Sequence, residues 1–551
     1  MAIDQILFKK LASGHPKPAG VNFSYGTAGF RMKSEMLDSI MFRVGLIAAL
    51  RSRKMDGQAI GVMVTASHNP AEDNGVKIVE PRGEMLDQAW EAHVTKFVNI
   101  EDDDQLLQAV EELSKNLGID NSNPSKVVFG RDTRPSGPKL IESLVDGIKS
   151  LKSEYQDFDI KTTPQLHYIV RCLNTLGKPD AYGEPTEKGY YSKLAKAFKS
   201  LMKNKEKPSP LTVDCANGVG APKLRDLAVA LGDSLSIIIA NDDVDSASKL
   251  NYQSGADFVK VNHQFPQNTV GKPQMRYCSL DGDADRIVYY YASPTGALKL
   301  LDGDKISGLA AMFLIDLVKQ ASLNLKVGVV QTAYANGSST TYLRETLNVP
   351  VACAKTGVKH LHHEAEKFDI GVYFEANGHG TVLFSPVSLE KIHSAMNPTA
   401  LQTLTPAQAD AMASLGSVVD LINQTVGDAL SDMLLVEVVL AHRGWSLEEW
   451  DAAYIDLPNR LAKVVVQDRT IFSTTDAERK LTHPEGLQTK IDALVSKYHS
   501  GRSFVRPSGT EDVVRVYAEA ATRQECDDLA LAVANLVHKE AGGKGEPLSS
   551  F

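Results

Sequence analysis

The sequence predicts an α/β protein built from several domains. With 551 residues the chain is longer than a single hydrophobic core normally supports, so three or four domains are expected. Three segments share one plan, in which a β-branched strand runs into a glycine-rich polar loop and helical periodicity follows. After about Trp450 short strands and helices alternate in another pattern, which predicts a small α+β domain.

The three similar segments each begin with a short β-branched strand. Each is expected to supply an early strand of one α/β unit, with a functional loop at the carboxyl end of that strand. Their likeness lies in pattern rather than identity, so the sequence predicts similar domains rather than copies of one. The segments are Val127–Gly137, Leu211–Gly220 and Val327–Gly337.

Domain boundaries are expected where these patterns break. Met202–Pro210 is charged and interrupted by prolines, which is typical of a linker. Asp302–Ile306 is expected to open a helix, and alanine and leucine recur at helical spacing from about Leu401 to Leu447. The predicted domains are residues 1–205, 206–300, 301–450 and 451–551. The last domain is expected to contain strands at 463–467, 501–505 and 512–518 and helices at 487–497 and 523–539.

Composition and charge narrow the function classes. Hydrophobic residues at 43% and charged residues at 23% are ordinary globular values. The net charge of −9 argues against a nucleic-acid partner, so a local group of Lys, Arg and N–H donors would have to hold any phosphorylated substrate. The five cysteines are scattered and form no Cys-x-x-Cys pair, which indicates a reducing compartment. With no signal-like start and no membrane-length apolar run, we expect a cytoplasmic protein without a membrane partner.

The most informative stretch is Asp281–Arg286, which reads DGDADR. Its aspartates, Asp281, Asp283 and Asp285, are separated by single small residues, so an extended backbone would turn all three carboxylates to one side. Strand-like segments precede and follow, which predicts a strand–loop–strand element. Three hard oxygen donors with small spacers suit Mg²⁺, which keeps water or substrate phosphate at its other positions.

Two other interpretations of this loop stay open from the residues alone. A calcium loop of the helix–loop–helix kind would need Gly at its sixth position and Glu at its twelfth, where the chain has Arg286 and Ala292. No helical pattern precedes the loop either. A solvated acidic turn is the simpler alternative.

A serine loop follows another apolar strand. Ile60–Val64 runs into Thr65–Pro70, which reads TASHNP, and the Asn-Pro pair fixes a turn that leaves Ser67 at the strand end. A lone serine in such a place is more often a helix cap, and a triad nucleophile is another alternative. The chain has no Gly-x-Ser-x-Gly elbow, however, and His68 is poorly placed to act as the base. As a phosphoryl carrier, Ser67 would need a metal and nearby cationic groups. The chain offers carboxylates that could bind a metal, and it offers Lys and Arg side chains.

Two further loops carry polar groups suited to a phosphosugar. Arg506–Glu511 lies between two expected strands with Arg515 close behind, and its side chains and N–H groups would form an anion cradle. A surface turn is the alternative there. Glu375–Gly380 follows the expected strand Ile370–Phe374 and offers Glu, Asn and His to sugar hydroxyls, although an ordinary turn is the default for so short a motif.

A nucleotide cofactor is not expected. Gly218 and Gly220 follow the expected strand Leu211–Asp214 and partly match a dinucleotide-binding fingerprint. The third glycine position of that fingerprint is occupied by Lys223.

The loops are more specific together than singly. A serine loop, a three-aspartate loop, a hydroxyl-reading loop and an anion cradle follow one another, one per predicted domain. From about Asn22 to Ala520 the chain therefore resembles the α-D-phosphohexomutase superfamily. Tyr25–Arg31, Glu375–Gly380 and Arg506–Glu511 are most similar to eukaryotic phosphoacetylglucosamine mutases. The resemblance implies an α/β fold with four domains around a central cleft, three of them similar mixed-sheet domains and the C-terminal one α+β.

The resemblance implies that Ser67 is the phosphorylated serine. Its phosphate would hold one Mg²⁺ per active site together with Asp281, Asp283 and Asp285. Such a site suits phosphoryl transfer, because catalysis of that reaction consists mainly of alignment and of neutralising charge on the phosphoryl oxygens.

The resemblance also implies the cationic and proton-transferring groups. Arg31 and Arg286 would clasp the serine phosphate, since guanidinium groups match phosphate oxygens in pairs. Lys77 is implied as a general acid/base, with His379 as a second candidate. A lysine can act as a base only if its neighbours lower its pKa.

The remaining implied residues would bind the sugar and the phosphate that is not being transferred. They come from the sugar loop, a second sugar-recognition loop at Thr356–His360 and the anion cradle. For the sugar they are Glu375, Asn377, Gly378, Lys359 and His360, and for the phosphate Arg506, Ser508, Gly509, Thr510 and Arg515.

The implied reaction interconverts N-acetylglucosamine 6-phosphate and N-acetylglucosamine 1-phosphate in UDP-N-acetylglucosamine biosynthesis. It would proceed through a phosphoserine enzyme and a 1,6-bisphosphate, with glucose or N-acetylglucosamine 1,6-bisphosphate as activator. Sugar phosphates are thus the expected partners, while monomer and homodimer both stay open. The alternatives are a phosphoglucomutase or phosphomannomutase of the same superfamily and a catalytically silent relative that binds sugar phosphates.

Overall fold

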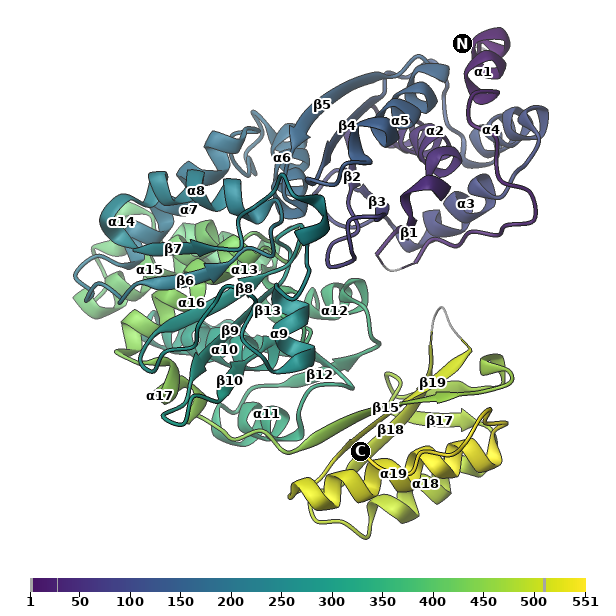
Figure 1. Ribbon diagram of the computed structural model, residues 1–551. Coiled ribbons are helices and arrows are strands. Elements are labelled where there is room, and N and C mark those ends of the chain that lie inside the picture. Colours follow the sequence, from purple (N-terminus) through teal and green to yellow (C-terminus); the bar gives the residue numbers. More distant parts are fainter. Residues whose placement is uncertain (1–2, 27, 509–511) are drawn as a thin grey trace. The chain divides into compact units, whose positions relative to one another are not determined.

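The computed structural model describes residues 3–26, 28–508 and 512–551. Figure 1 shows how mixed sheets flanked by helices succeed one another along the described chain. The fold divides into two compact units, of which the first contains residues up to 302, 377–381 and 413–444, and the second 303–376, 382–412 and 445–551.

The first sheet has the strand order β1 (Phe30–Lys33), β3 (Asp73–Val79), β2 (Ala59–Val64), β4 (Lys126–Arg131) and β5 (Glu154–Ile160). β4 is parallel to β2 and β5, whereas β3 is antiparallel to β1 and β2. Helices α2 (Asp38–Lys54) and α5 (Gly137–Ser150) cover one face and α6 (Thr163–Thr175) the other (Figure 1). Because both faces are covered, β2 is an unbroken apolar run.

The second sheet repeats this arrangement, with the order β10 (Leu298–Leu301), β9 (Ile287–Ala292), β8 (Arg276–Leu280), β6 (Leu211–Asp214) and β7 (Ile237–Ala240). β6 is parallel to β7 and β8, and β9 is antiparallel to β8 and β10. Helix α9 (Ala256–Asn262) packs its apolar side on β8 and β9. Helix α8 (Gly220–Leu231) follows β6 and packs on α7 (Glu187–Leu201).

The third sheet has the order β14 (Gly380–Phe384), β13 (Ile370–Phe374), β11 (Val327–Thr332) and β12 (Val351–Ala354). β11 is parallel to both β12 and β13. Helices α10 (Gly303–Gln320) and α12 (Val358–Ala365) pack against β11 and β13.

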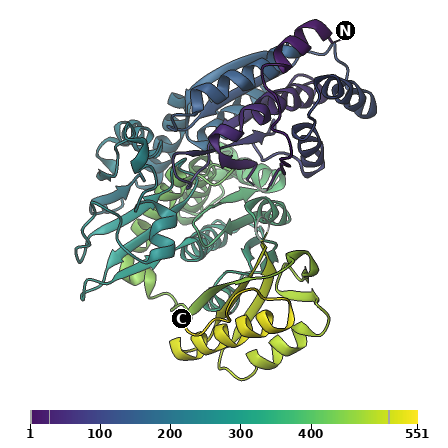
Figure 2. The same ribbon diagram turned by 45° about the vertical axis from the view of Figure 1, so that its right-hand side comes forward.

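The C-terminal sheet is antiparallel, with the order β15 (Asn459–Val465), β19 (Val513–Glu519) and β18 (Arg502–Pro507). Helices α18 (Leu487–Val495) and α19 (Arg523–Glu540) bury their apolar sides against one face of it. Both views show α19 lying along this sheet (Figures 1 and 2). A separate hairpin of β16 (Ser473–Thr475) and β17 (Lys480–His483) lies beside β18.

The predicted fold class is confirmed. The three segments with the repeated sequence plan form β4, β6 and β11, and each of these strands has a parallel neighbour on both sides. The final α+β domain is also present, with β15 at 459–465 instead of 463–467.

We expected a functional loop at the carboxyl end of each of these three strands, but the serine, aspartate and sugar loops follow neighbouring strands, the apolar segments after which their own sequences predicted them. β2, β8 and β13 occupy the same place in their sheets, each between a parallel neighbour and the strand that comes next in the chain. The serine loop follows β2, the aspartate loop β8 and the sugar loop β13. The glycine-rich loops after β4, β6 and β11 therefore take other roles, two of which are described with the site.

The expected helical stretch from Leu401 to Leu447 is two helices, α15 (Pro406–Leu421) and α16 (Ala429–Arg443), with residues 422–428 between them. None of the helices in the described ranges is long and apolar enough to cross a membrane. The other α-helices are α1 (Gln5–Ala12), α3 (Gln88–Val98), α4 (Asp103–Leu117), α11 (Gly337–Thr341), α13 (Pro386–Ala395), α14 (Pro398–Leu401) and α17 (Leu447–Asp451).

Candidate active site

Ser67 and the three aspartates lie together in the first unit. Ser67 is fully buried, and its hydroxyl donates a 2.6 Å hydrogen bond to Asp281 Oδ2. Asp281, Asp283 and Asp285 are 1%, 0% and 3% exposed, so this is no solvated acidic turn. A strand, β8, precedes the aspartate loop, which also excludes the helix–loop–helix calcium site.

Ser67 is held in an uncommon backbone conformation. Its φ of +51° lies in the left-handed region, which non-glycine residues rarely adopt. Its N–H donates to Thr65 Oγ1 at 2.9 Å, and its carbonyl oxygen accepts from Arg134 Nη2 at 2.8 Å and Asn251 Nδ2 at 2.9 Å. The chain then turns into β3 rather than into a helix, so the helix-cap interpretation is wrong. Arg134 lies in the loop after β4, which therefore supports the serine loop.

The predicted strand–loop–strand element is confirmed by β8 and β9, and the loop between them turns instead of running extended. Ala284 has a φ of +57°, and its N–H donates to the carbonyl oxygen of Asp281 at 3.1 Å. Asp281 Oδ1 accepts from the backbone N–H groups of Asp285 and Arg286 at 3.0 and 3.2 Å. This side-chain capping brings the three carboxylates together, so that one oxygen of each lies within 4.8 Å of the others.

The donor set fits a divalent cation. Burial and the neighbouring Asp285 and Asp283 raise the pKa of Asp281 well above its usual value. Asp283 Oδ2 accepts a 2.6 Å hydrogen bond from Thr163 Oγ1, whereas its buried Oδ1 has no hydrogen-bond partner among the described residues. Three close, buried carboxylates with an unmatched oxygen are suited to Mg²⁺, whose charge would offset their repulsion.

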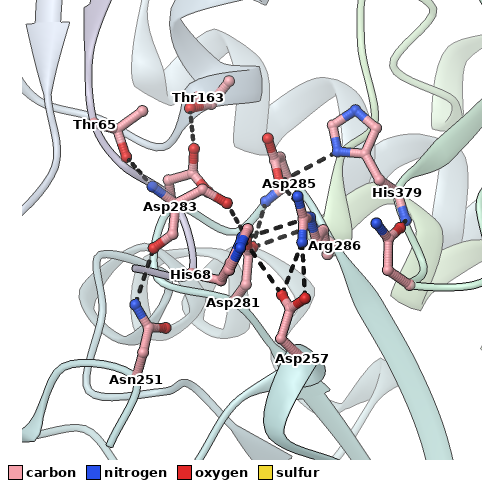
Figure 3. Close-up of polar contacts among 12 residues, drawn as sticks. Thr65, His68, Thr163, Asn251, Asp257, Asp281, Asp283, Asp285, Arg286 and His379 are labelled. Carbon is pink, nitrogen blue, oxygen red and sulfur yellow. Dashed lines mark hydrogen bonds and ion pairs between the residues drawn. The ribbon is translucent and has the colours of Figure 1, made fainter. Parts of the chain in front are cut away.

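Lys77 and His379 both contact the aspartates. Lys77 Nζ lies 3.4 Å from Asp283 Oδ2 and 3.3 Å from Asp285 Oδ2. His379 Nδ1 lies 3.2 Å from Asp285 Oδ1 (Figure 3). Burial alone would lower the pKa of Lys77, but Asp283 and Asp285 outweigh it and the pKa is raised. The carboxylates thus favour protonated Lys77, opposite to the lowered pKa that a lysine base requires.

The predicted phosphate-clasping arginines have partners that the sequence did not reveal. Arg286 Nη1 lies 2.9 and 2.8 Å from the two carboxylate oxygens of Asp257, on α9 (Figure 3). Arg31 Nη1 lies 3.4 Å from His68 Nδ1 and 3.4 Å from Asn69 Oδ1. Burial, and then Arg286, lowers the pKa of His68 to about 4, so a neutral His68 can accept from Arg31. Asp257 was not predicted from the sequence, because an acidic residue in the first turn of a short helix is common and indicates no particular role.

Two segments without a sequence motif support the aspartate loop. Thr163 begins α6, and its hydroxyl contacts Asp283 (Figure 3). Its N–H also donates a 3.2 Å hydrogen bond to the carbonyl oxygen of Asp283. The start of α16 and the loop before it contact the same turn. The N–H of Ala429, the first residue of α16, donates to the carbonyl oxygen of Ala284 at 3.1 Å. A Cβ on Gly427 would lie 3.0 Å from the carbonyl oxygen of Asp285.

Gly218 serves packing in this unit. A Cβ there would lie 2.5 Å from the carbonyl oxygen of Gly282, so only glycine lets the loop after β6 approach the aspartate loop. This close approach accounts for the glycine that partly matched a dinucleotide fingerprint.

The sugar loop has parts in both units. Asn377 Oδ1 accepts from the N–H of His379 at 3.0 Å, and Gly378, with φ +86°, packs against the start of β9, where its carbonyl oxygen accepts from Ile287 N at 3.2 Å. These contacts fix the position of His379. Glu375 belongs to the second unit, where its carboxylate accepts from the N–H of Gly357 at 3.1 Å.

The remaining predicted binding residues lie in the second unit. Lys359 is buried and His360 half-buried on α12. Ser508 is buried, and its N–H donates to the carbonyl oxygen of Val513 at 2.9 Å. Gly509 and Thr510 lie outside the described residues.

A row of cations crosses the C-terminal sheet. Arg506 pairs with Arg515 between β18 and β19, and Arg515 pairs with Lys463 between β19 and β15. Directly paired residues project to the same face, so these side chains are neighbours. Lys463 was not singled out in the sequence, because only the strand register brings it beside Arg515.

Models of known domain families match most of the chain. "Phosphoglucomutase/phosphomannomutase, alpha/beta/alpha domain I" matches residues 46–105 and 98–178, and the C-terminal domain of the same family matches 461–536. "Phosphoacetylglucosamine mutase AMG1" domains II and III match residues 180–288 and 302–445.

Relatives match over nearly the whole length. Phosphoacetylglucosamine mutase of Sus scrofa is 51% identical over 541 residues, which is 98% of each chain. The structure of Aspergillus fumigatus N-acetylphosphoglucosamine mutase in complex with GlcNAc-6P and magnesium has a TM-score of 0.92 and 54% identity, and covers 96% of this chain and 98% of that one. An alanine-for-serine variant of the A. fumigatus enzyme in complex with glucose 1,6-bisphosphate has a TM-score of 0.92 and 53% identity, over 98% and 99% of the chains.

Proposed function

This chain belongs to the phosphoacetylglucosamine mutase family, and from that premise we propose that it interconverts N-acetylglucosamine 6-phosphate and N-acetylglucosamine 1-phosphate. As an isomerase it would serve UDP-N-acetylglucosamine synthesis. The observation that carries the proposal is the buried hydroxyl of Ser67, which lies 2.6 Å from Asp281 in a cluster of three carboxylates. A serine so placed can carry a phosphoryl group beside a divalent cation.

The metal is proposed to be Mg²⁺. Asp281, Asp283, Asp285 and the phosphate on Ser67 would hold it, and a relative has been crystallised with magnesium. Bound there, Mg²⁺ supplies Lewis-acid stabilisation of the phosphoryl oxygens during transfer.

In the first half-reaction a hydroxyl oxygen of the sugar phosphate attacks the phosphorus on Ser67. The bond from phosphorus to the sugar oxygen forms while the bond to Ser67 Oγ breaks. The hydroxyl proton of the sugar passes to a base, and Ser67 Oγ regains a proton and becomes a hydroxyl again. The hydrogen bond from Ser67 Oγ to Asp281 corresponds to this dephosphorylated state.

His379 is favoured as the base, with Lys77 as a charge-stabilising cation. His379 Nδ1 faces Asp285, which orients the ring and leaves Nε2 for proton transfer. That Nε2 is buried and lacks a hydrogen-bond partner within the described part of the chain. Lys77 is held protonated by Asp283 and Asp285, and its charge can offset that of the transferring phosphoryl group.

In the second half-reaction the 1,6-bisphosphate presents its other phosphate to Ser67. Glu375 and Asn377 are proposed to bind the sugar hydroxyls, and Arg506, Ser508 and Arg515 the phosphate that is not being transferred. Both ends of the bisphosphate would use the same phosphate-binding residues in turn. An added 1,6-bisphosphate activates because it rephosphorylates Ser67 whenever the intermediate has escaped.

Location and domain limits are part of the proposal. A reducing, cytoplasmic location is supported by the cysteines, all five of which are free thiols and four of which are buried. The boundary near residue 205 is supported by the chain between α7 and β6, and that near 450 by the change of sheet after α17. The boundary near 300 is supported by the division between the two compact units after Asp302.

A comparison of substrates tests the proposed reaction. The protein should turn over N-acetylglucosamine 6-phosphate faster than glucose 6-phosphate, each with Mg²⁺ and catalytic 1,6-bisphosphate. Faster turnover of glucose 6-phosphate would favour a phosphoglucomutase. No turnover of either, together with no phosphate on Ser67 in the intact mass, would indicate a silent relative.

A further inference from the structure

The turn between β16 and β17 is strained. Asp476, Ala477 and Glu478 have φ values of +53°, +53° and +69°, although none of them is glycine. Three such residues in succession persist only where the surrounding structure holds them. Arg479 contributes, because its Nε donates to the carbonyl oxygen of Asp476 at 3.1 Å. This turn positions the side chain of Glu478.

The carboxylate of Glu478 bonds two groups of the second unit that belong to the predicted binding loops. One oxygen accepts a 2.9 Å hydrogen bond from Arg506 Nη1, and the other accepts a 2.9 Å hydrogen bond from the N–H of Thr356. The next N–H along the chain, that of Gly357, donates to Glu375. The successive N–H groups of Thr356 and Gly357 therefore bond two glutamates. Glu478 pairs with Arg506, and Glu375 is the residue predicted to bind the sugar.

The ion pair of Glu478 with Arg506 is largely shielded from solvent. The Glu478 and Arg506 side chains are only 15% and 17% exposed, so solvent screens their ion pair weakly. A substrate phosphate on Arg506 would lie close to the Glu478 carboxylate, and two anions at one guanidinium repel each other. Arg506 also donates from Nε to the hydroxyl of Tyr334 at 3.0 Å, which keeps the guanidinium in place when its anionic partner changes.

We propose that Glu478 is a positioning residue that occupies Arg506 in the absence of substrate phosphate and yields it when phosphate binds. The inference rests on the proposed function, since it takes Arg506 as a ligand of the phosphate that is not being transferred. Glu478 also accepts from the N–H of Thr356, and the neighbouring N–H of Gly357 donates to Glu375. When phosphate displaces Glu478, the Thr356–Gly357 segment that bonds Glu375 is therefore affected as well.

The exchange has a consequence for turnover. Each phosphate of the 1,6-bisphosphate must leave Arg506 before the other can take its place. A carboxylate that returns to Arg506 shortens the time for which either phosphate stays bound. Glu478 thus lowers the affinity of Arg506 for phosphate and allows the bisphosphate to reorient faster.

The test is Glu478→Gln, which keeps the shape and an acceptor oxygen for Thr356 but removes the charge. Inorganic phosphate, which cannot turn over, is used as a competitive inhibitor against N-acetylglucosamine 6-phosphate. We expect its inhibition constant to fall about fivefold or more, because the competing anion is gone. KM for the sugar phosphate should fall as well, and kcat should also fall, because the bisphosphate reorients more slowly.

Asp476→Asn is the matched control, because it removes one negative charge from the same turn while Asp476 bonds Arg479 and not Arg506. It should leave the phosphate inhibition constant within about twofold of the parent. An unchanged or raised inhibition constant in Glu478→Gln, or an equal fall in Asp476→Asn, would overturn the inference.

Arg506→Ala separates this inference from the proposed function. Alone it should weaken phosphate inhibition, and in its presence Glu478→Gln should have no further effect. If Arg506→Ala leaves both KM and phosphate inhibition unchanged, the proposed role of Arg506 fails and the role of Glu478 fails with it. If Arg506→Ala weakens binding and Glu478→Gln does not tighten it, only the role of Glu478 fails.

Discussion

The hydroxyl of Ser67 lies 2.6 Å from a carboxylate oxygen of Asp281, although 214 residues separate them in the chain. The serine is fixed by hydrogen bonds to its backbone, and the aspartate by two N–H groups of its own turn. Both loops are therefore held by hydrogen bonds, the serine loop through the side chains of Thr65 and Arg134 and the aspartate loop within its own turn.

Replacement of Ser67 by alanine tests the phosphoryl carrier. Ser67→Ala should lower kcat by orders of magnitude, because no other oxygen occupies its place beside Asp281, while sugar-phosphate binding survives. Calorimetry with N-acetylglucosamine 6-phosphate and a coupled rate assay measure the two properties, and intact mass reports the loss of the phosphate. Activity equal to that of the parent would exclude Ser67 as the carrier.

The hydroxyl of Thr163 should matter for metal affinity. Thr163→Val removes the 2.6 Å hydrogen bond to Asp283 Oδ2. This bond orients the carboxylate so that its other oxygen, Oδ1, stays available to the metal. We expect Mg²⁺ to bind about tenfold more weakly, as is typical when a hydrogen-bond partner of a ligand is lost. Calorimetric titration with Mg²⁺ measures this without turnover.

Two companion variants make the Thr163 result specific. Thr163→Ser keeps the hydroxyl and should restore metal affinity. Thr175→Val, at the other end of α6, removes a hydroxyl that donates to the carbonyl oxygen of Arg171 and accepts from the N–H of Tyr182, and should have no effect on Mg²⁺. Equal weakening in Thr175→Val would point to a general disturbance of the helix.

Replacement of Arg515 should affect binding more than chemistry. Arg515 lies between Arg506 and Lys463 on the C-terminal sheet, so Arg515→Ala removes one cation from the proposed phosphate site. That phosphate is bound alike before and during transfer, and KM should rise while kcat changes little. Steady-state kinetics with N-acetylglucosamine 6-phosphate measure both constants. A fall in kcat at constant KM would assign Arg515 another role.

His15 should make the stability of the first unit depend on pH. His15 Nδ1 lies 3.0 Å from Asp38 on α2 and its Nε2 lies 3.3 Å from Asp146 on α5, while Arg43 donates to the carbonyl oxygen of His15. The hydrogen bond to Asp38 raises the pKa of His15 although burial opposes it, and Asp146 raises it further.

Because the pKa of His15 is higher in the folded protein, its stabilising effect is fully present below the unfolded value of 6.5 and is lost as pH rises through the folded value. Thermal unfolding of the parent and of His15→Gln should therefore differ most near pH 6 and converge by about pH 9. Asp38, with its pKa lowered, stays ionised throughout this range. A difference that grows with pH would contradict this role.

Much of the chemistry could be predicted from the residues. The aspartate and serine loops lie where apolar strands end, so their positions follow from local pattern, and their composition indicates a cation and a phosphoryl carrier. The repeated strand–glycine–helix plan was sufficient to predict the α/β sheets. Strands that are buried on both faces are continuous apolar runs, and such runs can be recognised in the sequence. The strand–loop–strand element around the aspartates was predicted correctly. The turn within it was not predictable from alternation, because side-chain capping by Asp281 overrides an extended geometry.

What only the tertiary structure decided are contacts between segments remote in sequence. Thr163, Asp257 and Glu478 carry no local pattern of their own, because each acquires its role from a partner supplied by another part of the chain. The strand order likewise gave β2, β8 and β13 equivalent places in their three sheets, which no local pattern predicted. Sequence patterning determines which residues are buried and which are chemically competent, whereas long-range packing determines which of them meet.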